Sequence, residues 1–189
     1  MSHEIDPNTS YASLLSEILL TDDELQQRIC ELGEEVSTSY ANASKLLLVC
    51  VLKGGVMFLT DLMRQINIPH SIDFMAVSSY GTGVRQSSGH VRILMDLQQD
   101  IANRDVLVVE DIIDSGHTLQ YLMAQLEARQ PASLKICCLL SKPSRREVDI
   151  PIDFLGFEIP DKFVFGYGLD LDEKYRNLPF IGVFKGQID

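Results

Sequence analysis

Positive charge is scarce in this chain of 189 residues. Only 16 Lys and Arg stand against 27 Asp and Glu, which gives a formal net charge of −11 at pH 7. A surface with this excess of carboxylates repels polyanions. The composition therefore disfavours general nucleic-acid binding, although one local basic site remains compatible with it.

Long apolar runs and paired cysteines are also missing. The longest runs, such as 45–52, end well short of the ~20 apolar residues that span a bilayer, and no basic, apolar leader with a small-residue cleavage site opens the chain. The four cysteines have no CxxC spacing, so the pattern predicts buried free thiols rather than a disulfide framework or a zinc site. We therefore expect a cytoplasmic protein that makes no membrane contact.

The rest of the composition is that of a globular protein, with 46% hydrophobic residues. At roughly 100–200 residues per domain, the length predicts a single domain over 1–189. Apolar periodicity predicts helices at 21–44, 56–66 and 114–129, and strands at 46–52, 72–80, 91–97, 105–110 and 134–141. Strands that are apolar on both faces and alternate with helices predict an α/β fold with a mostly parallel central sheet flanked by helices. Ligands of such a sheet bind at the carboxyl ends of its strands.

Two segments depart from this alternation. Residues 78–89 are rich in Gly and Ser, which predicts a mobile hairpin loop. After Pro143, short apolar stretches are separated by Pro, Gly and aromatic residues. This second pattern predicts a small subdomain packed over the sheet.

The most informative segment is the acidic end of the predicted strand 105–110. Glu110 and Asp111 follow a buried apolar run, and Asp114 comes after two isoleucines, at the start of the predicted helix. Carboxylates this close repel one another by several kcal/mol in a partly desolvated crevice unless a cation or a polyhydroxylated ligand relieves them. Residues 115–118 add backbone N–H groups at a helix start, which is a phosphate-binding arrangement. Together these features predict a phosphorylated, hydroxyl-rich substrate held with Mg²⁺.

Three other interpretations were weighed for this segment. Asp114 or Ser115 could simply cap the helix, with the other acids solvated. A nucleotide triphosphatase of the Walker type would need the motif G-x-x-x-x-G-K-[ST], which the chain lacks. A haloacid-dehalogenase-type phosphatase would need two aspartates separated by one residue, whereas Asp111 and Asp114 are separated by two.

Segment 108–119, VVEDIIDSGHTL, resembles the phosphoribosyl-pyrophosphate-binding signature of the type I phosphoribosyltransferases. Residues 52–55 are similar to that family's pyrophosphate loop, and residues 79–81 to the start of its flexible catalytic loop. Residues 141–143, 156–171 and 175–176 are similar to the purine-binding hood of the hypoxanthine-guanine branch. The resemblance covers about residues 20–185. It implies a type I phosphoribosyltransferase-like core at about 20–142, and a hood formed by about 143–189 with the N-terminal segment.

The resemblance implies a role for each matched position. Glu110 and Asp111 hold the ribose hydroxyls with the help of Mg²⁺, and Asp114 is the catalytic base that accepts the N7 proton of the purine. The amides and hydroxyls of the following turn hold the 5′-phosphate, with His117 contributing its backbone rather than an acid or base. The substrate-binding positions in this stretch are Ile113, Asp114, Ser115, Gly116, His117 and Thr118.

Pyrophosphate leaves as a polyanion, so the site needs cations despite the acidic surface. By the same resemblance Lys53, the Gly54 amide and Arg176 supply them, with Mg²⁺ held on the far side by Asp170. The implied metal ligands are thus Glu110, Asp111 and Asp170. In that family the peptide between the positions of Leu52 and Lys53 is cis, which sequence alone does not decide.

The purine end selects a branch of the family. The Lys142 ammonium would donate to O6 of a 6-oxopurine, whereas adenine places an amino donor there. Phe163 would stack on the base, and the backbone of Val164 would bond its edge. Ser79 and Tyr80 would begin a loop that closes over the site and excludes water.

The resulting hypothesis is a Mg²⁺-dependent purine-salvage enzyme. It would make inosine or guanosine monophosphate from phosphoribosyl pyrophosphate and hypoxanthine or guanine, as a homodimer or homotetramer. One alternative is a regulatory nucleotide- or RNA-binding protein on the same fold, which would need a basic face and would not need Lys142 or Phe163. Another is a transferase for adenine or a pyrimidine, for which Lys142 would have no purpose.

Overall fold

The structure is a computed structural model that describes residues 9, 11–80 and 90–186. A six-stranded sheet forms its centre, in the order β4-β3-β2-β5-β6-β7. All neighbouring strands are parallel except β3 and β4, which are antiparallel. The prediction of a mostly parallel α/β fold is therefore confirmed. The strands are β2 (Leu46–Leu52), β3 (His70–Tyr80), β4 (His90–Met95), β5 (Asp105–Ile113), β6 (Ser133–Ser141) and β7 (Phe154–Glu158).

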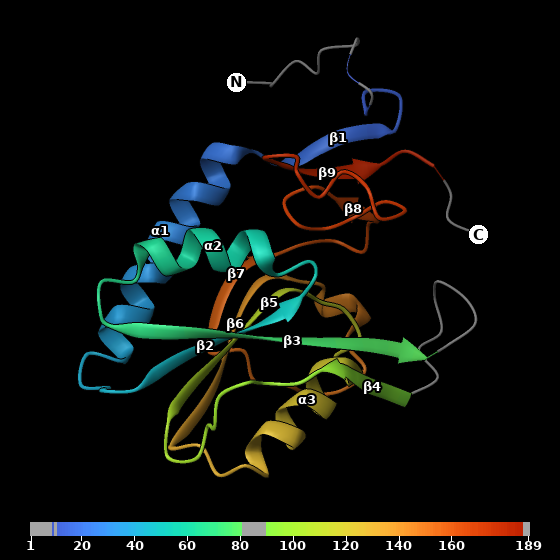
Figure 1. The fold of residues 1–189 in the computed structure, drawn as a ribbon. Coiled ribbons are helices and arrows are strands. Elements are labelled where there is room, and N and C mark those ends of the chain that lie inside the picture. The colour runs from blue at the N-terminus through green and yellow to red at the C-terminus, as the bar shows by residue number, and fades with distance from the viewer. Residues whose placement is uncertain (1–8, 10, 81–89, 187–189) are drawn as a thin grey trace.

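Helices cover both faces of this sheet (Figure 1). Helices α1 (Asp22–Ser39) and α2 (Val56–Gln65) lie on one face, and α3 (His117–Glu127) lies on the other. Helix α1 begins as its sequence predicts, because Thr21 and Glu24 form a reciprocal capping box. It ends at Ser39, five residues before the predicted boundary. No helix among the described residues is long and apolar enough to cross a membrane.

A second, three-stranded antiparallel sheet lies at the top of the view, beside α1 and α2 (Figure 1). It has the order β1-β9-β8, so it joins the N-terminal β1 (Leu15–Leu20) to β8 (Val164–Phe165) and β9 (Ile181–Phe184) near the other end of the chain. The sequence pattern did not predict strand β1. Strand β7 lies beyond Pro143 but extends the central sheet, because it pairs with β6.

Four local expectations need correction or restriction. Cys30 is exposed on α1, whereas the other three cysteines are buried as predicted. Strand β5 continues three residues past the predicted end, and α3 begins at His117 rather than at residue 114. The predicted mobile loop lies mostly outside the described residues, since 81–89 are not described.

Candidate functional site

Three neighbouring parallel strands, β2, β5 and β6, bring the predicted site residues to one edge of the sheet. Their carboxyl ends lead into Lys53, Asp114 and Lys142 respectively. Ile113 on β5 pairs with Ser141 on β6, and the Lys142 N–H donates to the Ile113 carbonyl at 3.0 Å. Because parallel neighbours end at the same edge, segments 28 to 89 residues apart in sequence meet there.

The acidic pair lies inside this edge. Asp111 is buried and Glu110 is half-buried, and both belong to β5 rather than to the turn after it. The Asp111 carboxylate packs directly against Gly54, where an added Cβ would lie 1.6 Å from Asp111 Oδ2. Only glycine fits at position 54 beside this carboxylate.

Burial raises the pKa of Glu110 well above its ordinary value, and the charge of Asp111 raises it further. Burial also raises the pKa of Asp111. The buried Glu110 Oε2 has no hydrogen-bond partner among the described residues. A charged pair in this setting is poorly compensated, so the site favours a ligand that brings a cation or hydroxyl donors.

The turn after β5 is built for close approach by a ligand. Gly116 is the N-cap of α3 with φ of 91°, and no side chain caps the helix. The interpretation that Asp114 or Ser115 caps the helix is therefore wrong. Within the described part of the chain, the N–H groups of residues 115–118 donate to no oxygen. These free N–H groups at a helix N-terminus form an anion-binding arrangement.

Two cations face Asp114. Lys142 Nζ lies 3.8 Å from Asp114 Oδ2, and Arg145 Nε lies 3.4 Å from Asp114 Oδ1. Lys142 is only 6% exposed although it follows a strand end, where lysines are usually solvated. Buried lysines are normally paired with an anion or placed for function, and here the Asp114 carboxylate is the ion-pair partner.

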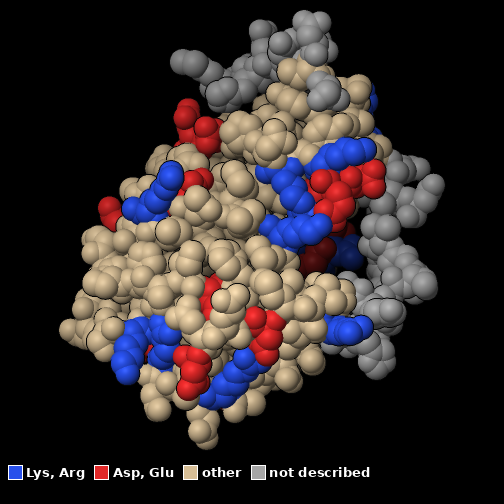
Figure 2. Space-filling model, in the orientation of Figure 1, with Lys and Arg blue, Asp and Glu red and all other residues tan. Residues whose placement is uncertain are grey.

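The residues of the predicted pyrophosphate loop lie against the segment that follows β8. Gly168 approaches the loop so closely that a Cβ added to it would lie 2.1 Å from the Gly54 carbonyl oxygen. Arg176 bonds the Gly168 carbonyl through NH1, at 2.8 Å, and the Asp170 carboxylate through NH2, at 2.9 Å. The peptide between Leu52 and Lys53 is cis. In this region Figure 2 shows basic and acidic side chains gathered beside a hollow, on the side that carries the small sheet.

The purine-hood residues lie on and beside β8. Phe163 precedes the strand, is 37% exposed, and meets Phe184 edge-on at a ring-centroid distance of 6.0 Å. Val164 is buried within the small sheet. Arg145 connects this segment to the catalytic edge, since its NH1 lies 3.6 Å from Asp161 Oδ2 while its Nε faces Asp114.

Some predicted site residues are not brought together with the rest. Asp170 pairs with Arg176, and the described residues contain no group of three or more His, Cys, Asp or Glu side chains able to hold a metal. His117 faces Glu147, with Nε2 and Oε2 2.8 Å apart, so its side chain has a partner outside the predicted site. The side chains of Ser79 and Tyr80 lie outside the described residues.

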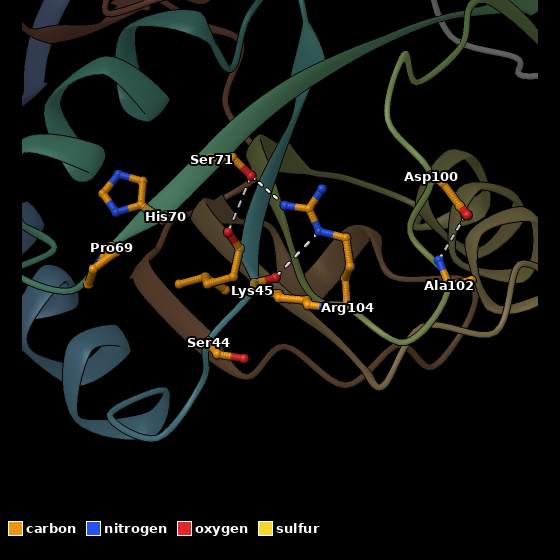
Figure 3. Close-up of a pocket in the computed structure, with 9 residues that line it drawn as sticks. Ser44, Lys45, Pro69, His70, Ser71, Asp100, Ala102 and Arg104 are labelled. Atoms are coloured by element: carbon orange, nitrogen blue, oxygen red, sulfur yellow. Dashed lines mark hydrogen bonds between the residues drawn. The ribbon is translucent and has the colours of Figure 1, made fainter.

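A hollow of about 510 Å³ lies at the opposite edge of the central sheet (Figure 3). Its wall includes Lys45, His70 and Arg104, which stand at the amino ends of β2, β3 and β5. The Arg104 guanidinium is already bonded to Ser71, to Gln99 and to the Lys45 carbonyl. Since the hollow is lined by none of the predicted site residues, we interpret it as a structural junction between strands.

Comparison with known proteins decides the family. Residues 17–174 match the model of the phosphoribosyl transferase domain. The chain belongs to the phosphoribosyltransferase family. It is 50% identical over 167 residues to the hypoxanthine phosphoribosyltransferase of Salmonella typhimurium, covering 88% of this chain and 93% of that one. It is 49% identical over 187 residues to the hypoxanthine-guanine phosphoribosyltransferase of Mycobacterium avium, covering 96% and 92%.

Solved structures agree with this assignment. A crystal structure of a hypoxanthine phosphoribosyltransferase from Staphylococcus aureus superposes with a TM-score of 0.90 at 45% identity, covering 95% of this chain and 97% of that one. The central sheet and its flanking helices are thus those of a type I phosphoribosyltransferase.

Sequence reasoning missed several residues that lie among the predicted site residues. Arg145 and Asp161 flank the catalytic edge, Gly168 touches the pyrophosphate loop, and Glu173 pairs with Lys53. The signal for Arg145 was its position three residues after Lys142. Glu173 had no comparable signal, because its partner is 120 residues away.

Proposed function

We propose that this phosphoribosyltransferase makes inosine or guanosine monophosphate in purine salvage. It would transfer the 5-phosphoribosyl group of phosphoribosyl pyrophosphate to N9 of hypoxanthine or guanine and release pyrophosphate. The observation that carries the proposal is the buried Lys142 ammonium, 3.8 Å from Asp114, at the same strand edge as the free amides of residues 115–118. This arrangement offers a donor for a purine O6 beside an acceptor for a purine N–H.

The proposed reaction has the following bond changes. N9 of the purine attacks C1′, the bond between C1′ and the pyrophosphate oxygen breaks, and pyrophosphate leaves with the bonding electrons. Asp114 accepts the proton that N7 loses, and its carboxylate also stabilises the positive charge that develops on the sugar. The free amides at the start of α3 hold the 5′-phosphate.

The remaining predicted residues complete the proposed site. Lys53, the Gly54 amide and Arg176 bind the pyrophosphate. Phe163, whose ring is partly exposed, stacks on the base. The loop that starts at Ser79 and Tyr80 closes over the reacting centre and excludes water, which would otherwise capture the sugar cation.

Mg²⁺ is part of this proposal. Carboxylate oxygens are the protein ligands that Mg²⁺ prefers, and it usually takes one or two of them together with phosphate oxygens of the substrate. Glu110 and Asp111 fit this requirement, because Glu110 Oε2 is buried without a hydrogen-bond partner among the described residues. Glu110 and Asp111 would hold this ion, whereas Asp170, which lies apart from them and pairs with Arg176, would contact Mg²⁺ only on the far side of the pyrophosphate. When bound, the ion neutralises phosphate charge and orients the substrate.

Two further features belong to the proposal. We place the enzyme in the cytoplasm, since its four cysteines are free thiols, as expected of a reducing compartment. We also propose a homodimer or homotetramer. Strand β4 lies at an edge of the central sheet and exposes 62% of Leu94, which a second copy of the chain could cover.

A panel of bases tests the proposed function. The protein is incubated with phosphoribosyl pyrophosphate, Mg²⁺ and one of hypoxanthine, guanine, xanthine or adenine, and nucleotide formation is followed. We expect turnover with hypoxanthine or guanine, and its loss when Mg²⁺ is removed. Turnover with adenine alone would refute the 6-oxopurine assignment, and no turnover with any base would refute the proposed activity.

A further inference from the structure

Glu173 holds both cations that the proposed function assigns to pyrophosphate. Its Oε2 atom lies 2.8 Å from Lys53 Nζ and 3.4 Å from Arg176 NH2. Lys53 comes from the turn after β2, and Arg176 from the segment after β8, so one carboxylate oxygen joins two distant parts of the site.

The local backbone directs Glu173 toward these cations. Leu171 and Lys174 form an isolated antiparallel bridge with two mutual backbone hydrogen bonds, of 3.1 and 3.2 Å. Glu173 lies inside this tight turn with φ of 62°, and its N–H donates to Asp170 Oδ2 at 2.9 Å. The position of the carboxylate is therefore supported by backbone contacts as well as by the ion pairs.

We infer that Glu173 is a positioning residue of the pyrophosphate subsite. Its carboxylate pairs with Lys53 and Arg176 when no diphosphate is bound, and a bound diphosphate displaces it. The inference rests on the proposed function for the identity of the ligand. The ligand chemistry is a diphosphate, whose oxygens need the same donors that the Glu173 carboxylate uses. A carboxylate that stays on Lys53 and Arg176 repels a diphosphate that approaches the same two cations, so the two anions compete.

The effect of Glu173 on diphosphate binding has an upper limit. The side chains of Lys53 and Glu173 are 68% and 65% exposed, and ion pairs this exposed are weak, so they change binding by about fivefold at most. Removing the Glu173 charge should therefore tighten diphosphate binding by about two- to fivefold. The same change should slow diphosphate release, because the carboxylate no longer reclaims the cations.

Asp172 provides a matched control. It is the neighbouring residue in the same turn, has φ of 53°, and is 89% exposed. It pairs with Lys174, at 3.6 Å, and has no ion pair with Lys53 or Arg176. The variants Asp172→Asn and Glu173→Gln each remove one negative charge from this turn, so a general electrostatic effect would be the same in both.

The experiment is a calorimetric titration of inorganic pyrophosphate with Mg²⁺ into the wild-type protein and the two variants. We expect the dissociation constant to fall two- to fivefold in Glu173→Gln and to change by less than about 1.5-fold in Asp172→Asn. The KM for hypoxanthine should be the same in all three proteins. Equal effects in the two variants, or weaker binding in Glu173→Gln, would overturn the inference.

The titration also separates this inference from the proposed function. If the wild-type protein binds pyrophosphate but forms no nucleotide with any base, the proposed activity fails while the Glu173 comparison stands. If nucleotide forms and the two variants bind pyrophosphate alike, only the role of Glu173 fails.

Discussion

The contact between Gly168 and the predicted pyrophosphate loop allows a test of whether backbone packing holds this loop in place. Gly168 is buried, has φ of 94°, and a Cβ added there would lie 2.1 Å from the Gly54 carbonyl oxygen. Real Cβ contacts essentially never fall below 3.0 Å, so the Gly168→Ala variant must displace the Gly54 backbone or its own. Gly54 in turn packs against the Asp111 carboxylate.

The cost of Gly168→Ala has two parts. A non-glycine residue at this φ costs about 1–2 kcal/mol, and overpacking against backbone costs about 1–3 kcal/mol more. The free energy of unfolding should therefore fall by about 2–5 kcal/mol. For a chain of this length each kcal/mol lowers Tm by about 2–4 °C, so Tm should fall by at least about 4 °C.

Gly166→Ala is the matched control. Gly166 has φ of 98°, and its added Cβ would lie 2.2 Å from the Phe180 carbonyl oxygen, in the small sheet rather than in the loop. Both variants should lose similar stability. Only Gly168→Ala should disturb the pyrophosphate loop, where a displacement near 1 Å lowers kcat/KM for phosphoribosyl pyrophosphate by about 10- to 100-fold.

Thermal unfolding and steady-state kinetics measure the two effects separately. Both variants are assayed well below their own Tm, so that the kinetics report on folded protein. The reasoning is refuted if kcat/KM for phosphoribosyl pyrophosphate is unchanged in Gly168→Ala, or if Gly166→Ala lowers it equally. A Gly168→Ala protein as stable as wild type would contradict the steric step itself.

Three further predictions concern the catalytic edge. Asp114→Asn should lower kcat by about 10²- to 10⁴-fold with much less effect on phosphoribosyl-pyrophosphate binding, because the amide cannot accept a proton; equal losses would count against the base assignment. Lys142→Met should raise the KM for hypoxanthine by about 10- to 100-fold and leave the KM for phosphoribosyl pyrophosphate nearly unchanged, since only the donor to O6 is lost; an unchanged hypoxanthine KM would remove Lys142 from the base site. Burial and the charge of Asp111 raise the pKa of Glu110, so the folded protein holds this proton more tightly than the unfolded chain. That contribution to stability is complete below the ordinary Glu pKa of 4.5 and is lost as the pH rises through the raised value. Tm measured across this range should fall less in Glu110→Gln than in wild type, and identical slopes would contradict the assignment.

Much of the sheet and one half of the site were predictable because their signals are local. The apolar strands predicted at 46–52 and 105–110 appear as β2 and β5, since a continuous apolar run of this length is typical of a strand that is buried on both faces. Glu110, Asp111 and the turn before α3 are consecutive in the chain, so their meeting required no knowledge of the fold. The boundary of α3 was predicted too early because Asp114 and Ser115 are favourable caps, whereas the N-cap is Gly116 at positive φ and the helix begins at His117.

The other half depended on contacts between distant segments. Strand β1 has little signal of its own and forms because β9, about 160 residues later, offers it a partner. Asp161 reaches Arg145, and Glu173 reaches Lys53, only after the segments beyond β7 have folded over the sheet edge. The path of these segments depends on residues at positive φ, such as Tyr167 and Gly168, whose conformation is selected by packing.

The sequence by itself therefore determined the chemistry available at one strand end: adjacent carboxylates, a glycine turn and free amides at a helix start. Which cations face those groups was decided by the tertiary structure alone. Lys142 and Arg145 converge on Asp114 because β5 and β6 are parallel neighbours, and Glu173 meets Lys53 because Gly168 packs on the loop. Local patterns specify which groups a segment carries, whereas the distances between segments follow from how the whole chain buries its apolar surface.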